Sequence, residues 1–329
     1  MYLRLLKKIT VSCLIFLYVM PLSVVADDLL FYRNDGTANI GYIDHSGKFQ
    51  QTDSRTDFAL NWSKIVAVGN SLLFYRNDGV GNVGYIDYTG KFHQTDSRTD
   101  LALNWSKIVA VGNNLLFYRN DGVANVGYID HAGKLQQTDS RTDLAKNWSQ
   151  IIAVGNNLLF YRNDGVANVG YINQKGKLQQ TDSRTDFALD WVKIIAVGEN
   201  VLFYRNDGIA NIGYIDHGGK FQQTDSRTDL AMDWSQIIAV GNNLLFYRID
   251  GVGNVGYIDH SGKLQQTDSR TDLALNWSKI VTVNNDLLFY KNNGVANIGY
   301  IDHGGKLQQT DSRTDFAKNW SKIVASGSE

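Results

Sequence analysis

The sequence is poor in cysteine and proline: its 329 residues contain one of each, Cys13 and Pro21. Both lie in the first 26 residues, which have the layout of a secretory signal peptide. The chain that follows them has no thiol. Disulfides, cysteine nucleophiles and cysteine-ligated metals are therefore excluded from the mature protein.

The signal peptide is predicted from charge and hydrophobicity. Residues 1–8 carry Arg4, Lys7 and Lys8, and an apolar run continues from Ile9 to about residue 25. It ends in a small-residue cleavage site at Ala26. An uncleaved membrane anchor is the alternative, but the run is short for one and no second apolar span follows. We expect a protein secreted outside the cell or into a periplasm, with one mature domain over residues 27–329.

Charge of one sign is also lacking. The formal net charge is −1 at pH 7, and loss of the three basic residues in the signal takes it to about −4. A mildly acidic, evenly mixed surface gives no footprint for nucleic acid or for an anionic membrane. We therefore expect neither a nucleic-acid partner nor stable membrane insertion.

What the chain has is a repeat. Its seven tryptophans each lie 43 residues from the last, and seven such units cover Leu29 to Glu329 with nothing left for a second domain. Repeat 1 contains four short stretches rich in β-branched and aromatic residues, bounded by Gly, Asn or Asp. They are Leu29–Arg33, Asn39–Asp44, Lys48–Asp53 and Lys64–Gly69.

Four strands in about 40 to 45 residues are typical of a propeller blade, so the sequence predicts an all-β, seven-bladed β-propeller. The small apolar stretch 65–69 suits the crowded inner strand, and the polar stretch 48–52 suits the outer edge. One blade should then combine Leu29–Asp53 with Lys322–Gly327 and close the ring. An open solenoid is the alternative, but no capping repeat is present. Residues 56–59 could form one capped helical turn.

The predicted strand order sorts the turns onto two faces. The turn at 44–47 and its copies vary among repeats, whereas Asp-Ser-Arg-Thr-Asp, first seen at 53–57, occurs in all seven units on the other face. Gly36 and Asn39 also recur there without variation. We interpret both as backbone fixtures of a turn that needs positive φ.

The unvarying face predicts a ring of similar polar pockets, each with Arg and Asp beside a tryptophan. Carbohydrates suit such pockets, because planar charged groups match hydroxyls and aromatic rings pack on the apolar face of a sugar. The alternative is structural: the segment pins the long connection and bridges blades, and the tryptophan is a wedge between them. The candidate ligand-binding residues are Arg33, Asp53, Arg55, Asp57, Trp62, Arg76, Asp96, Arg98, Asp100, Trp105, Asp139, Arg141, Asp143, Trp148, Asp182, Arg184, Asp186, Trp191, Asp225, Arg227, Asp229, Trp234, Asp268, Arg270, Asp272, Trp277, Asp311, Arg313, Asp315 and Trp320.

Catalysis is not expected. Five of the six histidines occupy the same turn position in different repeats and should lie far apart, and His93 lies on an outer strand. No pair is spaced for a metal. An active site needs a unique set of groups, whereas these repeats supply one set seven times. The Asn-Asp-Gly turn lacks the spaced acids of a strong calcium loop. We expect no cofactor and no metal.

The string W-x-x-I-V-x-V-G-x-x-L-L-F-Y-R at 62–76, with a later Gly-Tyr-Ile-Asp, resembles the repeats of tachylectin-type and bacterial propeller lectins. The resemblance covers all seven units. It implies a β-propeller that binds sugars in pockets between or on adjacent blades, often as a homo-oligomer. The matching positions are those of Trp62 and Tyr32 and the polar loop residues around them.

These observations predict a secreted, multivalent, non-catalytic lectin whose partners are glycans or glycoproteins. Clustered weak sites would give it avidity. The alternative is a non-catalytic scaffold that holds a partner protein on one propeller face.

Overall fold

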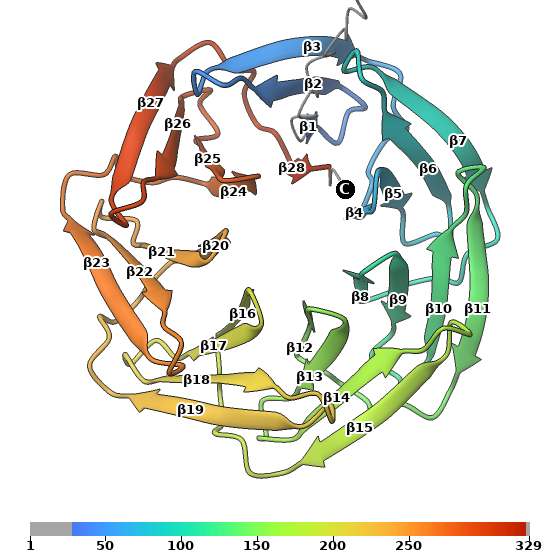
Figure 1. The fold of residues 1–329 in the computed structure, drawn as a ribbon. Coiled ribbons are helices and arrows are strands. Elements are labelled where there is room, and N and C mark those ends of the chain that lie inside the picture. Colours follow the sequence, from blue (N-terminus) through green and yellow to red (C-terminus); the bar gives the residue numbers. More distant parts are fainter. Residues whose placement is uncertain (1–27, 327–329) are drawn as a thin grey trace, which may run out of the picture.

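The computed structural model describes residues 28–326, and this part of the chain forms seven four-stranded antiparallel sheets without a helix. Figure 1 shows the sheets as blades around a central axis. The predicted seven-bladed β-propeller is confirmed. The predicted signal peptide lies outside the described residues.

Each blade runs from an innermost strand at the axis to an outer strand at the rim, and blades 1 to 7 are numbered here along the ring. The innermost strands, in blade order, are β28 (Lys322–Ala325), β4 (Lys64–Val68), β8 (Lys107–Val111), β12 (Gln150–Val154), β16 (Lys193–Val197), β20 (Gln236–Val240) and β24 (Lys279–Val283). The second strands are β1 (Asp28–Tyr32), β5 (Ser71–Tyr75), β9 (Asn114–Tyr118), β13 (Asn157–Tyr161), β17 (Asn200–Tyr204), β21 (Asn243–Tyr247) and β25 (Asp286–Tyr290). The third strands are β2 (Ala38–Ile43), β6 (Gly81–Ile86), β10 (Ala124–Ile129), β14 (Ala167–Ile172), β18 (Ala210–Ile215), β22 (Gly253–Ile258) and β26 (Ala296–Ile301). The outer strands are β3 (Phe49–Arg55), β7 (Phe92–Arg98), β11 (Leu135–Arg141), β15 (Leu178–Arg184), β19 (Phe221–Arg227), β23 (Leu264–Arg270) and β27 (Leu307–Arg313).

The second strands form the core of every blade. In β5 the four residues Leu72–Tyr75 are all buried, two on each side of the sheet. A strand can be apolar on both sides only when neighbouring sheets cover both. The outer strand β7 instead has one buried residue, Phe92, followed by exposed and half-exposed polar positions. The predicted order of strands from axis to rim is therefore correct.

The two ends of the described chain share blade 1. Strand β28 pairs antiparallel with β1, and the register joins Leu29 to Ala325 and Tyr32 to Lys322. The Ser321 hydroxyl donates to the carbonyl of Tyr32 at 2.8 Å. The N-terminal and C-terminal strands thus close the ring as the repeat phase predicts.

The outer strands are longer than predicted. β3 ends at Arg55 rather than Asp53, so the Asp-Ser-Arg part of the repeated segment is strand and not connection. A bulge opposite Ile40 and Gly41 leaves Thr52 as the extra residue. Its hydroxyl donates to the carbonyl of Gly90 in blade 2 at 2.9 Å. The bulge therefore directs the outer strand toward the next blade.

The predicted helical turn over residues 56–59 is absent. The amide of Phe58 donates to the carbonyl of Gly36 at 3.2 Å, and the amide of Asn61 donates to that of Asn34 at 3.1 Å. These bonds to the preceding turn take the donors that a helical turn would use. Gly36 has a φ of +85°, and a Cβ there would lie 2.4 Å from the Phe58 carbonyl oxygen. This position requires glycine, as expected.

Candidate functional site

The repeated Asp-Ser-Arg segment clamps each blade to the next one. At the junction of blades 2 and 3, Nη1 of Arg98 donates to the carbonyl of Leu135 at 2.8 Å, and the Leu135 amide donates to Oδ2 of Asp96 at 3.1 Å. The arginine bond recurs at all seven junctions. The bridging role of this segment is thus part of the fold.

The same arginine also forms an ion pair at the mouth of the junction. Nε and Nη2 of Arg98 both donate to the carboxylate of Asp100, each at 2.8 Å. These hydrogen bonds hold the pKa of Asp100 below its usual value. The Asp100 side chain is 67% exposed, so this planar, charged pair is accessible to a ligand.

A cavity lies behind this pair, between the two blades. At the junction of blades 2 and 3 its volume is about 200 Å³, and at the junction of blades 3 and 4 about 180 Å³. Besides Arg98 and Asp100, the first cavity is lined by Trp105 and by an amide pair, in which Nδ2 of Asn125 donates to Oε1 of Gln137 at 2.8 Å. The amide pair recurs in all seven blades.

The apolar floor of each junction is made by two matched side chains, one from each blade. One follows the Asp-Ser-Arg-Thr-Asp segment and the other begins the next outer strand. Both are leucine at four junctions and both are phenylalanine at three. The pairs, from junction 1/2 to junction 7/1, are Phe58–Phe92, Leu101–Leu135, Leu144–Leu178, Phe187–Phe221, Leu230–Leu264, Leu273–Leu307 and Phe316–Phe49.

The two kinds of floor give pockets of different shape. A Cβ built on Gly41 would lie 2.4 Å from the Phe49 ring, whereas one on Gly127 would lie 3.5 Å from Leu135. The phenylalanine therefore covers the glycine of the third strand, whereas at the leucine junctions that strand lines the pocket through Val126 and Gly127. At junction 7/1 the cavity is about 350 Å³, and Gly41 is not among its lining residues.

The predicted site residues divide into three groups. The arginine and second aspartate of the repeated segment line the pockets, as do the tryptophans. At four junctions the first aspartate, as at Asp96, accepts from a backbone amide of the neighbouring blade instead. Arg33 and Arg76 form ion pairs with Asp35 and Asp78 in their own turns and lie outside the described pockets.

The tryptophans are wedges as well as pocket residues. Trp105 is 2% exposed, and its ring centroid lies 5.8 Å from that of Phe117. Little of the indole ring is therefore open for stacking on a ligand. Its amide donates to the hydroxyl of Tyr75, which donates to the carbonyl of Ala102. Tyr75 is fully buried and is a structural clamp, not a pocket residue.

One interpretation of the sequence was wrong. Asn39 is not a turn residue with positive φ: it lies in β2, and its side chain faces the junction, bonded to Gln51 at 3.0 Å and to Ser54 at 3.1 Å. The repeated glutamines that complete the amide pair were missed. Their signal was an invariant Asn and an invariant Gln separated by 12 residues, as expected for partners on adjacent antiparallel strands.

A second surface that the sequence did not indicate is a groove on the face that carries the 44–47 turn and its copies. This face is called the variable face here. It has a volume of about 790 Å³ and is lined by Asn113, Asn156, Tyr171 and His217, among others. Tyr171 is 39% exposed, far more than any tryptophan. This face presents aromatic rings that a ligand can reach.

The described residues contain no group of three or more His, Cys, Asp or Glu side chains that could hold a metal ion. Within the same part of the chain, no helix has the length and apolarity needed to cross a membrane.

Comparison with known proteins identifies the fold. No protein-family model matches the chain, and no curated protein matches it. A solved structure of a protein from Lactobacillus plantarum is similar over 91% of this chain and 99% of its own, with a TM-score of 0.67 and 13% identity. The computationally designed Ika8 protein has a TM-score of 0.51 at 17% identity, covering 92% of this chain and 93% of its own. Sqt1 from Chaetomium thermophilum also has a TM-score of 0.51, at 14% identity, covering 83% and 78%. At these identities the likeness concerns the fold alone.

Proposed function

We propose that this protein is a secreted, non-catalytic, multivalent carbohydrate-binding protein whose sites are the blade junctions. The observation that carries the proposal is the recurrence of one pocket type: an arginine–carboxylate pair and an amide pair at the rim, over an apolar floor. A carboxylate accepts from two sugar hydroxyls, and an amide both donates and accepts. The apolar floor suits the C–H face of a sugar ring.

The size of the pockets supports a small ligand. The volumes at two leucine junctions, about 180 and 200 Å³, lie below the roughly 300–1,000 Å³ of pockets for drug-sized molecules, and the volume of about 350 Å³ at junction 7/1 lies near the lower end of that range. Each junction would therefore take one sugar residue of a longer glycan. Single contacts of this kind are weak, and repetition around the ring converts them into avidity for a glycan-coated surface.

The resemblance to tachylectin-type lectins in the sequence points the same way. The alternative, a scaffold for a partner protein, needs no small-molecule site. The repeated cavity behind the exposed ion pair favours the lectin over the scaffold. The groove beside Tyr171 is a second place where a sugar could bind this protein.

The test is a glycan array probed with the full-length protein, followed by competition with the free sugar. Binding to one class of glycan that the free monosaccharide displaces is the expected result. A silent array from folded protein would overturn the proposal and favour the scaffold.

Variants then locate the site. At the four leucine junctions, replacing the exposed aspartate by asparagine removes the negative charge but keeps the size of the side chain. The variants are Asp100→Asn, Asp143→Asn, Asp229→Asn and Asp272→Asn, and the matched control set is Asp57→Asn, Asp186→Asn and Asp315→Asn at the phenylalanine junctions. We expect the first set to lower binding at least tenfold and the control set to have a smaller effect, because only the leucine pockets reach the glycine of the third strand. Binding that survives both sets but is lost in Tyr171→Ala and its copies would move the site to the variable face.

A further inference from the structure

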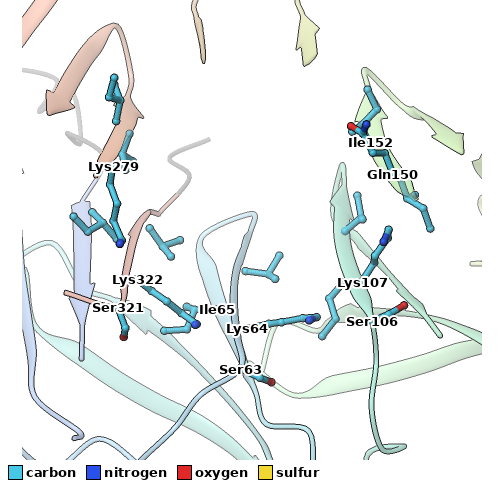
Figure 2. Close-up of a pocket in the computed structure, with 18 of the residues that line it drawn as sticks. Ser63, Lys64, Ile65, Ser106, Lys107, Gln150, Ile152, Lys279, Ser321 and Lys322 are labelled. Atoms are coloured by element: carbon cyan, nitrogen blue, oxygen red, sulfur yellow. The ribbon is translucent and has the colours of Figure 1, made fainter. Parts of the chain in front are cut away.

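The axial channel carries a cluster of positive charge that the proposed lectin sites do not use. The first residue of six of the seven innermost strands lines this channel, whose volume is about 730 Å³. The first residue is lysine in five blades and glutamine in two, and Lys193 is the one that does not line the channel. Four of the lysines, Lys279, Lys322, Lys64 and Lys107, lie on consecutive blades and are called the Lys arc here. Figure 2 shows their side chains extending from the inner strands into the channel.

The lysines of the Lys arc form no ion pair with the acids of residues 28–326. Within the described residues, no carboxylate lies within ion-pair distance of these four ammonium groups. Three acids of the inner hairpins, Asp28, Glu199 and Asp286, lie at the end opposite the first residues of the inner strands. Four strand residues separate the two ends, which is about 13 Å, more than the Debye length of about 8 Å at physiological salt.

The two glutamines at the lysine position supply a hydrogen-bond acceptor that the lysines lack. Oε1 of Gln150 accepts the amide of Ile194 on the next blade at 3.1 Å, and Nε2 donates to the carbonyl of Trp191 at 2.8 Å. Gln236 makes the same pair of bonds to Ile280 and Trp277. A glutamine thus satisfies both an N–H and a C=O at the inner edge of its neighbour.

A lysine can supply only the donor, since an ammonium group has no acceptor. Lys193 does so, donating to the carbonyl of Ser235 at 2.9 Å. Beside the Lys arc, the amides that correspond to Ile194, such as those of Ile65 and Ile108, have a lysine where Ile194 has Gln150, and no side-chain oxygen of residues 28–326 accepts from them. In the antiparallel register they point away from the second strand, toward the channel.

Burial also disfavours the charged form of these lysines, which increases their need for a partner anion. Burial lowers the pKa of all five lysines that begin an inner strand, and the charge of Lys64 lowers the pKa of Lys107 and Lys322 further. Like charges in a cleft with protein walls concentrate a positive potential there and attract anions. An oxyanion would supply acceptors to the ammonium groups and the edge amides together.

We propose that the Lys arc binds an oxyanion at the end of the channel near the start of the inner strands, with its oxygens on the edge amides that Gln150 and Gln236 cap elsewhere. The ligand chemistry is a phosphate, sulfate or carboxylate group, either free or carried by an acidic glycan. This site is separate from the blade junctions and does not depend on the lectin proposal.

The test is calorimetric titration of the full-length protein with inorganic phosphate and with sulfate at low ionic strength, where charges are least screened. The variant is Lys64→Gln with Lys107→Gln. It places glutamine where this fold already carries it in two blades, so it should fold. We expect it to raise the Kd for phosphate at least tenfold. Lys193→Gln is the matched control, because Lys193 lies outside the arc, and it should change the Kd less than twofold.

Titration with a sulfated disaccharide distinguishes an acidic glycan from a free anion. A sulfated disaccharide that binds more tightly than inorganic sulfate, and loses this advantage in the double variant, would identify an acidic glycan. Equal affinity would identify a free anion. No heat with phosphate, sulfate or the disaccharide, or the same Kd in the wild type and the double variant, would overturn the proposal. Binding to neutral glycans should be unchanged in every lysine variant, so the failure of one proposal is distinguishable from the failure of the other.

Discussion

The leucine and phenylalanine junctions perform the same structural task with different side chains. At junction 2/3, Leu101 meets Leu135, while at junction 1/2, Phe58 and Phe92 meet with ring centroids 4.8 Å apart. A third ring, Phe74, lies against both phenylalanines at 5.6 and 5.4 Å. At the leucine junctions the pocket reaches the glycine of the third strand, whereas at the phenylalanine junctions an aromatic ring covers that glycine.

The matching follows the interface and not the repeat. Phe92 and Leu101 belong to the same repeat but differ in kind, whereas each agrees with its partner across a junction. Protein interiors are close-packed, so a large side chain needs a partner shaped to it. The seventh pair, Phe316 with Phe49, agrees only because blade 7 adjoins blade 1. The side-chain pattern thus supports ring closure independently of the strand pairing.

The largest expected effect is the loss of a floor residue. Phe92→Ala should lower the free energy of unfolding by roughly 3–5 kcal/mol. Leu135→Ala should lower it by an amount near the lower end of roughly 2–5 kcal/mol, because Leu135 borders an existing cavity. Urea unfolding monitored by tryptophan fluorescence gives both values. Equal losses would mean that ring-to-ring contacts add nothing to the stability of the phenylalanine junction.

A mismatched pair should cost less than a deleted side chain. Leu135→Phe alone should destabilise by roughly 1–3 kcal/mol, because the added ring meets Leu101 in a space shaped for two leucines. Adding Leu101→Phe should recover part of this loss, with a coupling energy of roughly 0.5–3 kcal/mol. The same unfolding assay on both single variants and the double variant measures the coupling. Strict additivity would show that the matching has no energetic basis.

The clamp arginine should also distinguish the two junction types. Arg55 lies over the Phe58 ring at 5.6 Å, whereas the residue at the same position beside Arg98 is Leu101. A cation over an aromatic ring adds roughly 0.5–1 kcal/mol at an exposed site. Arg55→Ala should therefore cost more than Arg98→Ala by about that amount, since both lose the same backbone bond and ion pair. A larger loss in Arg98→Ala would contradict this account.

The fold could be predicted from the sequence because its signals are local and repeated. The spacing of the tryptophans gave the number of blades, and the strands at Leu29, Asn39 and Lys64 were placed within one residue at each end. The outer strand was predicted to end too early, since Asp53, Ser54 and Arg55 are typical of a connection. Their extended conformation depends on pairing with the third strand, which composition does not reveal.

The site was harder to predict, because each pocket is built from two repeats. Arg98 and Trp105 could be named from one repeat, but Gln137 lines the same pocket only because the next blade lies beside them. The matched floor has the same origin: Leu101 and Leu135 lie 34 residues apart, and their agreement acquires meaning once the blades are known to touch. Interface pairs of this kind need the ring before they can be recognised.

The smallest expected effect is the response to acid, which should be the same at both junction types. Hydrogen bonds from Arg55 and Arg98 lower the pKa of Asp57 and Asp100 in the folded protein. A lowered folded pKa contributes stability that is fully present above the unfolded value of about 3.9 and is lost as pH falls through the folded value. Both side chains are largely exposed, so solvent screens each pair and its effect is small. Thermal melts from pH 7 down to pH 2 should show Asp57→Asn and Asp100→Asn losing slightly less stability than the wild type below pH 4, each by a similar amount. A clear difference between the two variants would mean that the aromatic floor at Phe58 changes the titration of the carboxylate above it, and the two junction types would then differ in charge as well as in shape.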